Sequence, residues 1–404
     1  MTILIYKSIR KKMLKFNYHK DLPIVTPLKA KYLKEQVISL KNIHQPVQKS
    51  QEWYDMRNNM LTASDWGTIL GENHYSGKNE VLLKKCGEDK FITCAAMEWG
   101  NKYEEVANLI YQYRNNVEVL EFGCLRHPFL HFLGASPDGI TPEGIMLEIK
   151  CPVSRKITGI PPQHYWCQVQ GQLEVCELDR CDFLECSLKE YDNEEQYIND
   201  NFENNYILNS FGNEKGVIAE FYRKNDKGFF YEYSPVCIID KNLEEWKNNI
   251  INLHKDDNII FSKFTFWRLE EVSCIPIYRN QEWFNNAKIE LEIFWNKVIK
   301  YRNLGLNKLK EDIKNEKEIK NLEKDKIKEK KQKITVLSKS QKKINEYIVL
   351  DNGAINGQIN GAINGAINDP INDPINDPMC ISSDEDCYDD TYDDFDFKTN
   401  TSFL

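Results

Sequence analysis

The sequence predicts an α/β fold in which a small central mixed sheet is flanked by helices. Two observations support this class. Apolar residues recur at helical spacing across 95–116 and 163–178, whereas short apolar or β-branched runs lie between and after these segments. Turn-forming sequences such as Ser-Pro-Asp-Gly and Thr-Pro-Glu-Gly separate the short runs. The resulting order of helix, three strands, helix and strand is expected when helices pack on a sheet.

The remaining elements follow from the same kinds of pattern. Before residue 95, one helix is expected from 51 to about Arg57 and a second near Thr62, where Thr-Ala-Ser-Asp is a typical helix start. Strands are expected at 116–125, 131–136, 145–151 and 181–188, with a strand pair at 215–235. Amphipathic helices at 240–255 and 279–302 complete the predicted fold.

Composition divides the chain into four segments. Residues 1–50 are a basic lead-in with eleven Lys or Arg and two acids, which suits either a solvated arm or contact with a polyanion. Residues 51–305 are the predicted folded domain with a helical C-terminal extension, and 306–350 a Lys-rich helix or coiled coil. Residues 351–404 repeat Asn-Gly-Ala-Ile and Asn-Asp-Pro-Ile and end in an acidic run, so a disordered linker and tail are expected.

Several classes of protein are excluded by the sequence. It has neither the roughly 18 apolar residues in a row that a membrane span needs nor a signal-peptide pattern at its start. Its twelve cysteines form no C-x-x-C pair and are typical of reduced thiols. The protein is therefore expected to be intracellular and soluble, not secreted and not bound to a membrane. The spacing of Cys176, Cys181 and Cys186 does not suit an iron–sulfur cluster, and His127 and His131 lack a third zinc ligand.

The chemistry is concentrated where two charges interrupt an apolar strand. Glu148 and Lys150 alternate along this strand and should share one face. Asp138 lies on the preceding turn, and a hairpin through 141–144 should fold that turn back against the strand. Two carboxylates facing one point suit a Mg²⁺ ion, and the main-chain carbonyl of Ile149 would be a further ligand.

Each part of this group has an ordinary structural explanation when it is taken alone. Asp-Gly after Pro is usually a turn, and Glu-x-Lys on a strand is usually a solvent-facing pair. Their combination on a buried strand favours phosphodiester hydrolysis, in which Lys150 positions water beside the metal-binding carboxylates. Glu104, on the preceding helix, is the best candidate ligand for a second ion.

These residues carry a resemblance to a known family. Asp138 followed by Glu148-Ile149-Lys150 resembles the PD-(D/E)XK nuclease signature, whose core has the restriction-endonuclease-like fold. The YqaJ-like viral recombinase and lambda exonuclease family is more closely similar, and four motifs carry that likeness: WGNKYEEVA (99–107), SPDGI (136–140), LEIKCP (147–152) and HYWCQVQGQL (164–173). The resemblance implies a deoxyribonuclease that uses one or two Mg²⁺ ions, with Mn²⁺ as a substitute, and degrades linear duplex DNA from a 5′ end.

The resemblance also assigns roles to individual residues. It places the metal and catalytic centre on four charged residues and adds a glutamine: Glu104, Asp138, Glu148, Lys150 and Gln168. The upstream Arg and Thr-Ala-Ser element implies that Arg57 and Ser64 bind phosphate, although Ser64 could simply be a helix N-cap. Tyr165 lies one turn before Gln168 on the same helix face, and Ser136 would help to hold the turn of the aspartate.

The implied partners are DNA ends, a single-strand annealing protein and further copies of the chain in a homo-oligomer. The implied setting is viral DNA recombination or repair in the host cytoplasm or nucleus. The segment between Lys150 and Gln168 is shorter than in the phage member of the lambda exonuclease family. Two alternatives stay open: a structure-specific or Cas4-like endonuclease that uses the same centre, and a catalytically idle DNA-binding scaffold.

Overall fold

The computed structural model describes residues 26–47, 50–87, 94–203, 207–225, 228–238 and 240–351. The chain divides into two units, with the boundary between Leu322 and Glu323. The first unit holds both sheets and nearly all of the helices. No helix in the described ranges is both long enough and apolar enough to cross a membrane.

A six-stranded mixed sheet forms the centre of the first unit. Its strands, in spatial order, are β4 (Gly139–Ile140), β5 (Ile145–Lys150), β6 (Arg180–Glu190), β9 (Ile259–Tyr278), β7 (Lys215–Arg223) and β8 (Gly228–Tyr233). The β5 and β6 strands are parallel, and the other neighbours are antiparallel. The predicted α/β class, a mixed sheet flanked by helices, is confirmed.

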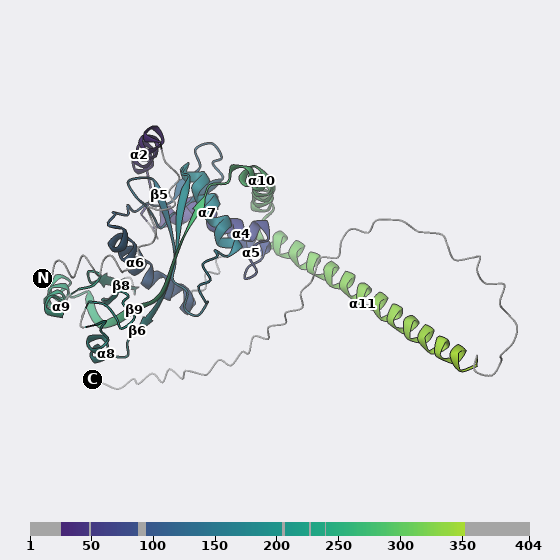
Figure 1. Ribbon diagram of the computed structural model, residues 1–404. Coiled ribbons are helices and arrows are strands. Elements are labelled where there is room, and N and C mark those ends of the chain that lie inside the picture. Colours follow the sequence, from purple (N-terminus) through teal and green to yellow (C-terminus); the bar gives the residue numbers. More distant parts are fainter. Residues whose placement is uncertain are drawn as a thin grey trace. The chain divides into compact units, whose positions relative to one another are not determined.

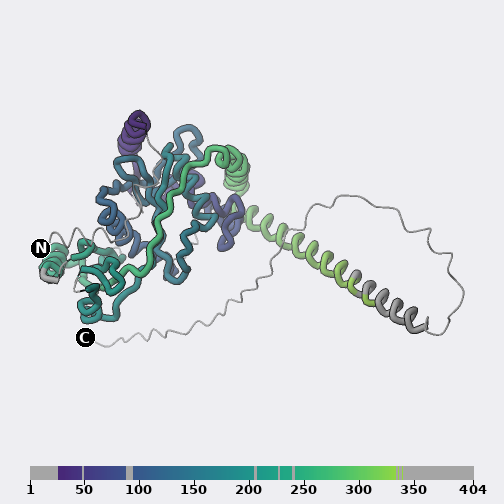
Figure 2. The backbone as a smooth tube through the Cα atoms, viewed as in Figure 1, coloured from purple at the N-terminus to yellow at the C-terminus, as the bar shows by residue number. Residues whose placement is uncertain are grey.

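The long strand β9 was not predicted from sequence patterns. One end of β9 pairs with β7 and the other end with β6, so the strand joins the two halves of the sheet. Figure 2 shows the chain crossing the folded unit along this path before it enters α10. Charged residues such as Lys263 and Arg268 interrupt the apolar alternation of β9, which explains why the pattern is weak.

A second, three-stranded sheet has the order β1 (Leu61–Thr62), β3 (Leu133–Ala135) and β2 (Leu125–Arg126). The expectation of a strand over 116–125 is wrong for most of that segment. Its backbone pairs only through an isolated bridge from Leu120 and through Leu125. Val119, Phe122 and Cys124 are nevertheless buried, so the apolar pattern reports the burial of an irregular segment.

Helices cover the two faces of the large sheet around β5 and β6. Residues of α6 (Ala95–Asn115) pack with Leu147 and Ile149 on one face. Residues of α7 (Gln163–Cys176) pack with Met146 and Phe183 on the opposite face. Figure 1 shows these helices on either side of the strands. Cys181 and Cys186 belong to different hydrophobic cores, so their side chains face opposite sides of the sheet. The two thiols therefore cannot bind the same iron–sulfur cluster.

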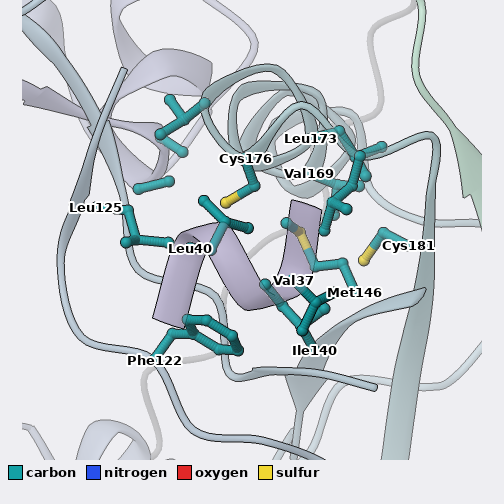
Figure 3. Close-up of a cluster of buried hydrophobic side chains, with 14 of the residues drawn as sticks. Val37, Leu40, Phe122, Leu125, Ile140, Met146, Val169, Leu173, Cys176 and Cys181 are labelled. Atoms are coloured by element: carbon teal, nitrogen blue, oxygen red, sulfur yellow. The ribbon is translucent and has the colours of Figure 1, made fainter. Parts of the chain in front are cut away.

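The described part of the basic lead-in contains a packed helix, α2 (Pro27–Asn42). Thr26 caps this helix, and Leu33, Val37 and Leu40 are buried in the cluster with α7, as Figure 3 shows for Val37 and Leu40. The interpretation of residues 1–50 as a solvated arm is therefore wrong for this helix, because its apolar stripe forms part of the core. Residues 1–25 lie outside the described residues.

Three short helices precede α6 along the chain within the described residues: α3 (Gln51–Asn58), α4 (Ala63–Leu70) and α5 (Lys78–Lys85). The α4 and α7 helices approach closely at two glycines. A Cβ on Gly67 would lie 2.9 Å from His164, and one on Gly171 would lie 2.8 Å from the Trp66 ring. These contacts place the start of α4 beside the middle of α7 and the middle of α4 beside the start of α7.

The C-terminal helices are α8 (Glu194–Asn199), α9 (Asp240–Leu253), α10 (Gln281–Leu304) and α11 (Leu306–Asp351). Phe284, Leu291 and Val298 of α10 pack with residues of α4 and α5. The predicted Lys-rich helix is present as α11, and side chains 323–333 in the second unit are exposed. The predicted linker and acidic tail, residues 352–404, lie outside the described residues.

Candidate active site

The site begins with the two charges on β5. Glu148 and Lys150 lie on the face covered by α7, because Leu147 and Ile149 point into the α6 side. The Glu148 side chain is only 1% exposed, and Lys150 Nζ forms an ion pair with Glu148 Oε1. A buried carboxylate needs such partners, because an uncompensated charge in this position would be strongly destabilising.

Asp138 joins this pair from the turn that precedes β4. The backbone pairing of β4 with β5 begins at Gly139, which lies opposite Leu147. One position further, Asp138 Oδ2 accepts a hydrogen bond of 2.6 Å from the Ile149 backbone N–H. The Asp138 side chain thus makes the hydrogen bond to β5 that follows the last backbone pair of β4. This places the Asp138 carboxylate beside the end of β5.

The electrostatics of the site show an excess of negative charge. Burial raises the pKa of Asp138 well above its ordinary value, and repulsion from Glu148 and Glu104 raises it further. Burial disfavours the charged form of Lys150, but the Glu148 and Asp138 carboxylates outweigh it and raise the pKa of this ammonium. The negative charges of Glu104, Asp138 and Glu148 therefore act on this centre, where the Lys150 ammonium is a nearby positive charge.

Glu104 is an exposed residue on α6, and its charge contributes to the raised pKa of Asp138. Among the described residues, no three His, Cys, Asp or Glu side chains converge as a ready-made metal site. The donor set fits a hard cation through two carboxylates and a main-chain carbonyl, since Mg²⁺ commonly keeps several water ligands.

Two glutamines of α7 hold Glu148 from the other side. Gln168 Nε2 donates to Glu148 Oε1 at 2.6 Å, and Gln172 Nε2 donates to Glu148 Oε2 at 2.6 Å. Gln172 Nε2 also lies 3.3 Å from the Ser136 carbonyl oxygen. Sequence reasoning named Gln168 and missed Gln172. Their separation of four residues places both on one helix face, and this spacing is the signal that could have identified Gln172.

Tyr165 lies against Lys150. The Lys150 Nζ is 4.8 Å from the centre of the Tyr165 ring, a cation–π distance. Arg155 approaches the same ring at 5.9 Å and forms an ion pair of 2.5 Å with Glu185. Glu185 lies opposite Lys150 in the β5–β6 register and is fully buried. Arg155 and Glu185 were not predicted, because their contact depends on strand pairing.

Arg57 reaches the site through Ser136. Its guanidinium lies 4.5 Å from the Trp53 ring, and Nη1 donates to Ser136 Oγ at 3.1 Å. Ser136 therefore connects Arg57 to the turn that carries Asp138. Lys85 supports the backbone behind this arrangement, because its Nζ donates to the carbonyl oxygens of Arg57 at 2.9 Å and Met60 at 2.7 Å.

Ser64 is the second residue of α4 and is exposed. The N-cap of α4 is Thr62, which forms a capping box with Asp65. The explanation of Ser64 as a simple N-cap is therefore wrong. Its hydroxyl lies 3.2 Å from the Thr62 hydroxyl at the positive end of the helix.

His127 is held by contacts with neighbouring residues. His127 Nδ1 accepts hydrogen bonds from the backbone N–H groups of Phe129 and Leu130, both at 3.1 Å. The imidazole also stacks on Phe284, with the ring centres 6.2 Å apart. These contacts make His127 a packed structural residue, whereas His131 is exposed.

Comparison with known proteins finds a family model that matches part of this chain. Residues 52–179 match the model of the YqaJ-like viral recombinase domain. All of the residues in the predicted centre and the predicted phosphate site lie inside the matched range, whereas β6, β9 and α10 lie outside it.

Two viral relatives share part of this sequence. An uncharacterized protein of Acanthamoeba polyphaga mimivirus is 35% identical over 301 residues, which cover 65% of this chain and 54% of that protein. A protein of African swine fever virus (strain Badajoz 1971 Vero-adapted) is 24% identical over 162 residues, covering 32% and 46%. The chain thus spans about half the length of the curated relatives it matches.

Solved structures similar to this one include an alkaline exonuclease from Laribacter hongkongensis. It is 18% identical with a TM-score of 0.37, and the match covers 66% of this chain and 99% of that one. A phage-related exonuclease from Haemophilus somnus 129PT is 10% identical with a TM-score of 0.34, covering 61% and 96%.

Proposed function

We propose that the protein is a metal-dependent deoxyribonuclease that hydrolyses phosphodiester bonds at the ends of linear duplex DNA, from 5′ to 3′, in viral DNA recombination or repair. The observation that carries the proposal is the meeting of Asp138, Glu148 and Lys150 at the end of β5. A buried group of two carboxylates and a lysine, placed beside a glutamine-bearing helix, is costly to maintain for structure alone. The match of the surrounding residues to the recombinase family model supports the same conclusion.

A divalent cation fits the centre by its charge and its donor chemistry. Asp138 and Glu148 would hold Mg²⁺, or Mn²⁺ in its place, together with the Ile149 carbonyl. Glu104 would contribute to a second ion, because its charge already acts on Asp138. When bound, the cation would neutralise phosphate charge and make a coordinated water more acidic.

Lys150 would act as a donor in this centre. Its raised pKa keeps the ammonium protonated, so it donates hydrogen bonds and does not accept a proton. It would hold the attacking water or a phosphate oxygen close to Glu148. Gln168 and Gln172 fix both oxygens of Glu148, so the carboxylate needs little reorganisation during the reaction.

Arg57, Ser64 and Ser136 would bind the phosphate at the 5′ end. The guanidinium of Arg57 suits a phosphate because it offers several donors in a planar fork. The start of α4 adds backbone N–H groups and the Ser64 hydroxyl. Ser136 connects the phosphate site to the Asp138 turn, because it contacts Arg57 and lies two residues before Asp138. A terminal phosphate would thereby be positioned relative to the scissile bond.

A single assay tests the proposal. A 5′-phosphorylated linear duplex is incubated with Mg²⁺ and with wild type, Lys150→Ala or the control Lys189→Ala, which changes an exposed lysine on β6. Wild type and the control should digest the duplex, whereas Lys150→Ala should be slower by about 100-fold or more. If wild type leaves the duplex intact, or if Lys150→Ala digests it equally well, the assigned centre is wrong.

Circular duplex DNA separates the proposal from its rivals. An enzyme that requires an end leaves the circle whole, whereas an endonuclease nicks it. A scaffold protein without catalytic activity would bind the linear duplex and leave both substrates intact. The same proposal includes a single-strand annealing partner and a homo-oligomer. A measurement of the protein's mass in solution tests the homo-oligomer.

A further inference from the structure

A row of aromatic rings leads from the catalytic lysine to the surface. The Tyr165 ring contacts Lys150, and its centre lies 4.1 Å from that of His164. The His164 ring in turn meets Tyr75 edge to face, with 6.0 Å between their centres. Tyr75 is 76% exposed. The row therefore has a partly buried end at the site and an open end in solvent.

Tyr75 sits on a turn that is tied to α4. Its backbone N–H donates to Asn73 Oδ1 at 3.0 Å, and Asn73 Nδ2 donates to Thr68 Oγ1 at 2.9 Å. His164 is fixed from the other helix, because Gly67 of α4 packs directly against it. The two rings are thus held by two elements in close contact, and the largely exposed Tyr75 leaves ring surface available.

Two cationic side chains lie at the inner end of this row. Lys150 and Arg155 are 4.8 Å and 5.9 Å from the centre of the Tyr165 ring, and each also forms an ion pair with a buried carboxylate. Burial lowers the pKa of His164, and the charges of Lys150 and Arg155 lower it further. His164 is consequently a neutral aromatic ring at neutral pH. Aromatic rings bordered by cationic side chains are the arrangement by which proteins bind a single nucleic-acid strand without reading its sequence.

We propose that Tyr75 and His164 form a stacking platform for bases of the DNA strand that passes into the active site. The inference rests on the proposed nuclease function, since the strand would enter at Lys150. Solitary exposed tyrosines are common on protein surfaces and need no function. Tyr75 differs from them because it continues a row of rings that ends at the proposed catalytic lysine.

The test uses binding as well as digestion. A short 5′-phosphorylated single strand carries 2-aminopurine at its second nucleotide, and its fluorescence is followed with EDTA present so that no cleavage occurs. Stacking on a tyrosine or histidine ring should quench this fluorescence in wild type and in Tyr75→Phe, which keeps the ring. Quenching should be reduced in Tyr75→Ala, which keeps only the His164 ring, and binding should weaken by roughly 5- to 150-fold, the range for loss of one stacked base.

Phe211→Ala is the matched control. Phe211 is 71% exposed and precedes β7, which is separated from β5 by β6 and β9 in the sheet. This variant should quench and bind as wild type does. Equal quenching by wild type and Tyr75→Ala, or equal losses in Tyr75→Ala and Phe211→Ala, would overturn the platform.

Digestion of a duplex with an abasic residue at the same position provides the second readout. Wild type should slow at the missing base, and Tyr75→Ala should show the same rate with and without it. A wild type that quenches 2-aminopurine but never digests DNA would refute the nuclease and leave the platform supported. A wild type that digests intact and abasic strands equally would refute the platform alone.

Discussion

Replacement of Lys85 by methionine should destabilise the protein strongly, because Lys85 balances a buried charge. The Lys85 side chain is 2% exposed, and its Nζ lies 2.9 Å from Oδ2 of Asp65, which is 7% exposed. Removal of one partner from a buried ion pair costs about 3–5 kcal/mol, because the other charge is left uncompensated. The carbonyl oxygens of Arg57 and Met60 would lose their donor as well.

The pKa of Asp65 gives an independent magnitude. Burial alone would raise this pKa, but Lys85 and then Lys84 outweigh burial and lower it from 3.8 to about 2. At 1.36 kcal/mol per unit, this difference corresponds to about 2.5 kcal/mol of stability. Because the folded pKa is depressed, the contribution is present above about pH 4 and is lost as the pH falls towards about 2.

The assay is guanidinium denaturation followed by circular dichroism at several pH values, with Lys78→Met as the matched control. Lys78 lies on the same helix, α5, but is exposed, so its replacement should change the unfolding free energy by less than about 0.5 kcal/mol. Lys85→Met should lose about 3–5 kcal/mol at pH 7, and the deficit should narrow on acidification. Equal losses in the two variants, or a deficit that stays constant down to pH 3, would refute the reasoning.

Three further outcomes are expected. Removal of divalent ions with EDTA should abolish digestion of linear duplex, and Mg²⁺ or Mn²⁺ should restore it while Ca²⁺ restores less; digestion that persists in EDTA would contradict the metal centre. Gln172→Leu should lower the rate by about 10- to 100-fold with little change in KM, because Glu148 loses a positioning donor; an unchanged rate constant would show that Gln168 alone holds Glu148. Arg302→Gln should reduce the preference for a 5′-phosphate over a 5′-hydroxyl by about 10-fold, because Arg302 binds the Asn58 carbonyl at 2.6 Å directly behind Arg57. Lys300→Gln on the same helix is its control, and a preference equal in both variants would contradict the argument.

The sequence predicted the parts of the site that depend on local periodicity. Glu148 and Lys150 share a face because alternation on a short strand determines it, and α7 follows from helical spacing over 163–178. The hairpin through 141–144 was also local, with Gly144 donating to the Thr141 carbonyl oxygen at 2.9 Å. The structure brings together the charges that these patterns predicted as neighbours.

The parts that were missed depend on long-range pairing. Glu185 lies opposite Lys150 only because β6 runs parallel to β5 in one particular register. The Lys85 and Asp65 pair joins α5 to α4, and no periodicity links a lysine to an acid twenty residues before it. The packing of α2 was missed because eleven basic residues obscured an apolar stripe that needs only Leu33, Val37 and Leu40.

The matched residues 52–179 depend on contacts with residues outside that range. The β5 strand carries Glu148 and Lys150, and within the described residues its strand partners are β4, which has two residues, and β6, which begins at the edge of the matched range. The backbone behind Arg57 is held by Arg302 of α10, which donates to the carbonyl oxygens of Asn58 and Lys85. Residues 52–179 therefore contain the proposed centre, while its geometry also depends on β6 and α10. Variation in these later elements would alter how the proposed centre is aligned without changing Asp138, Glu148 or Lys150.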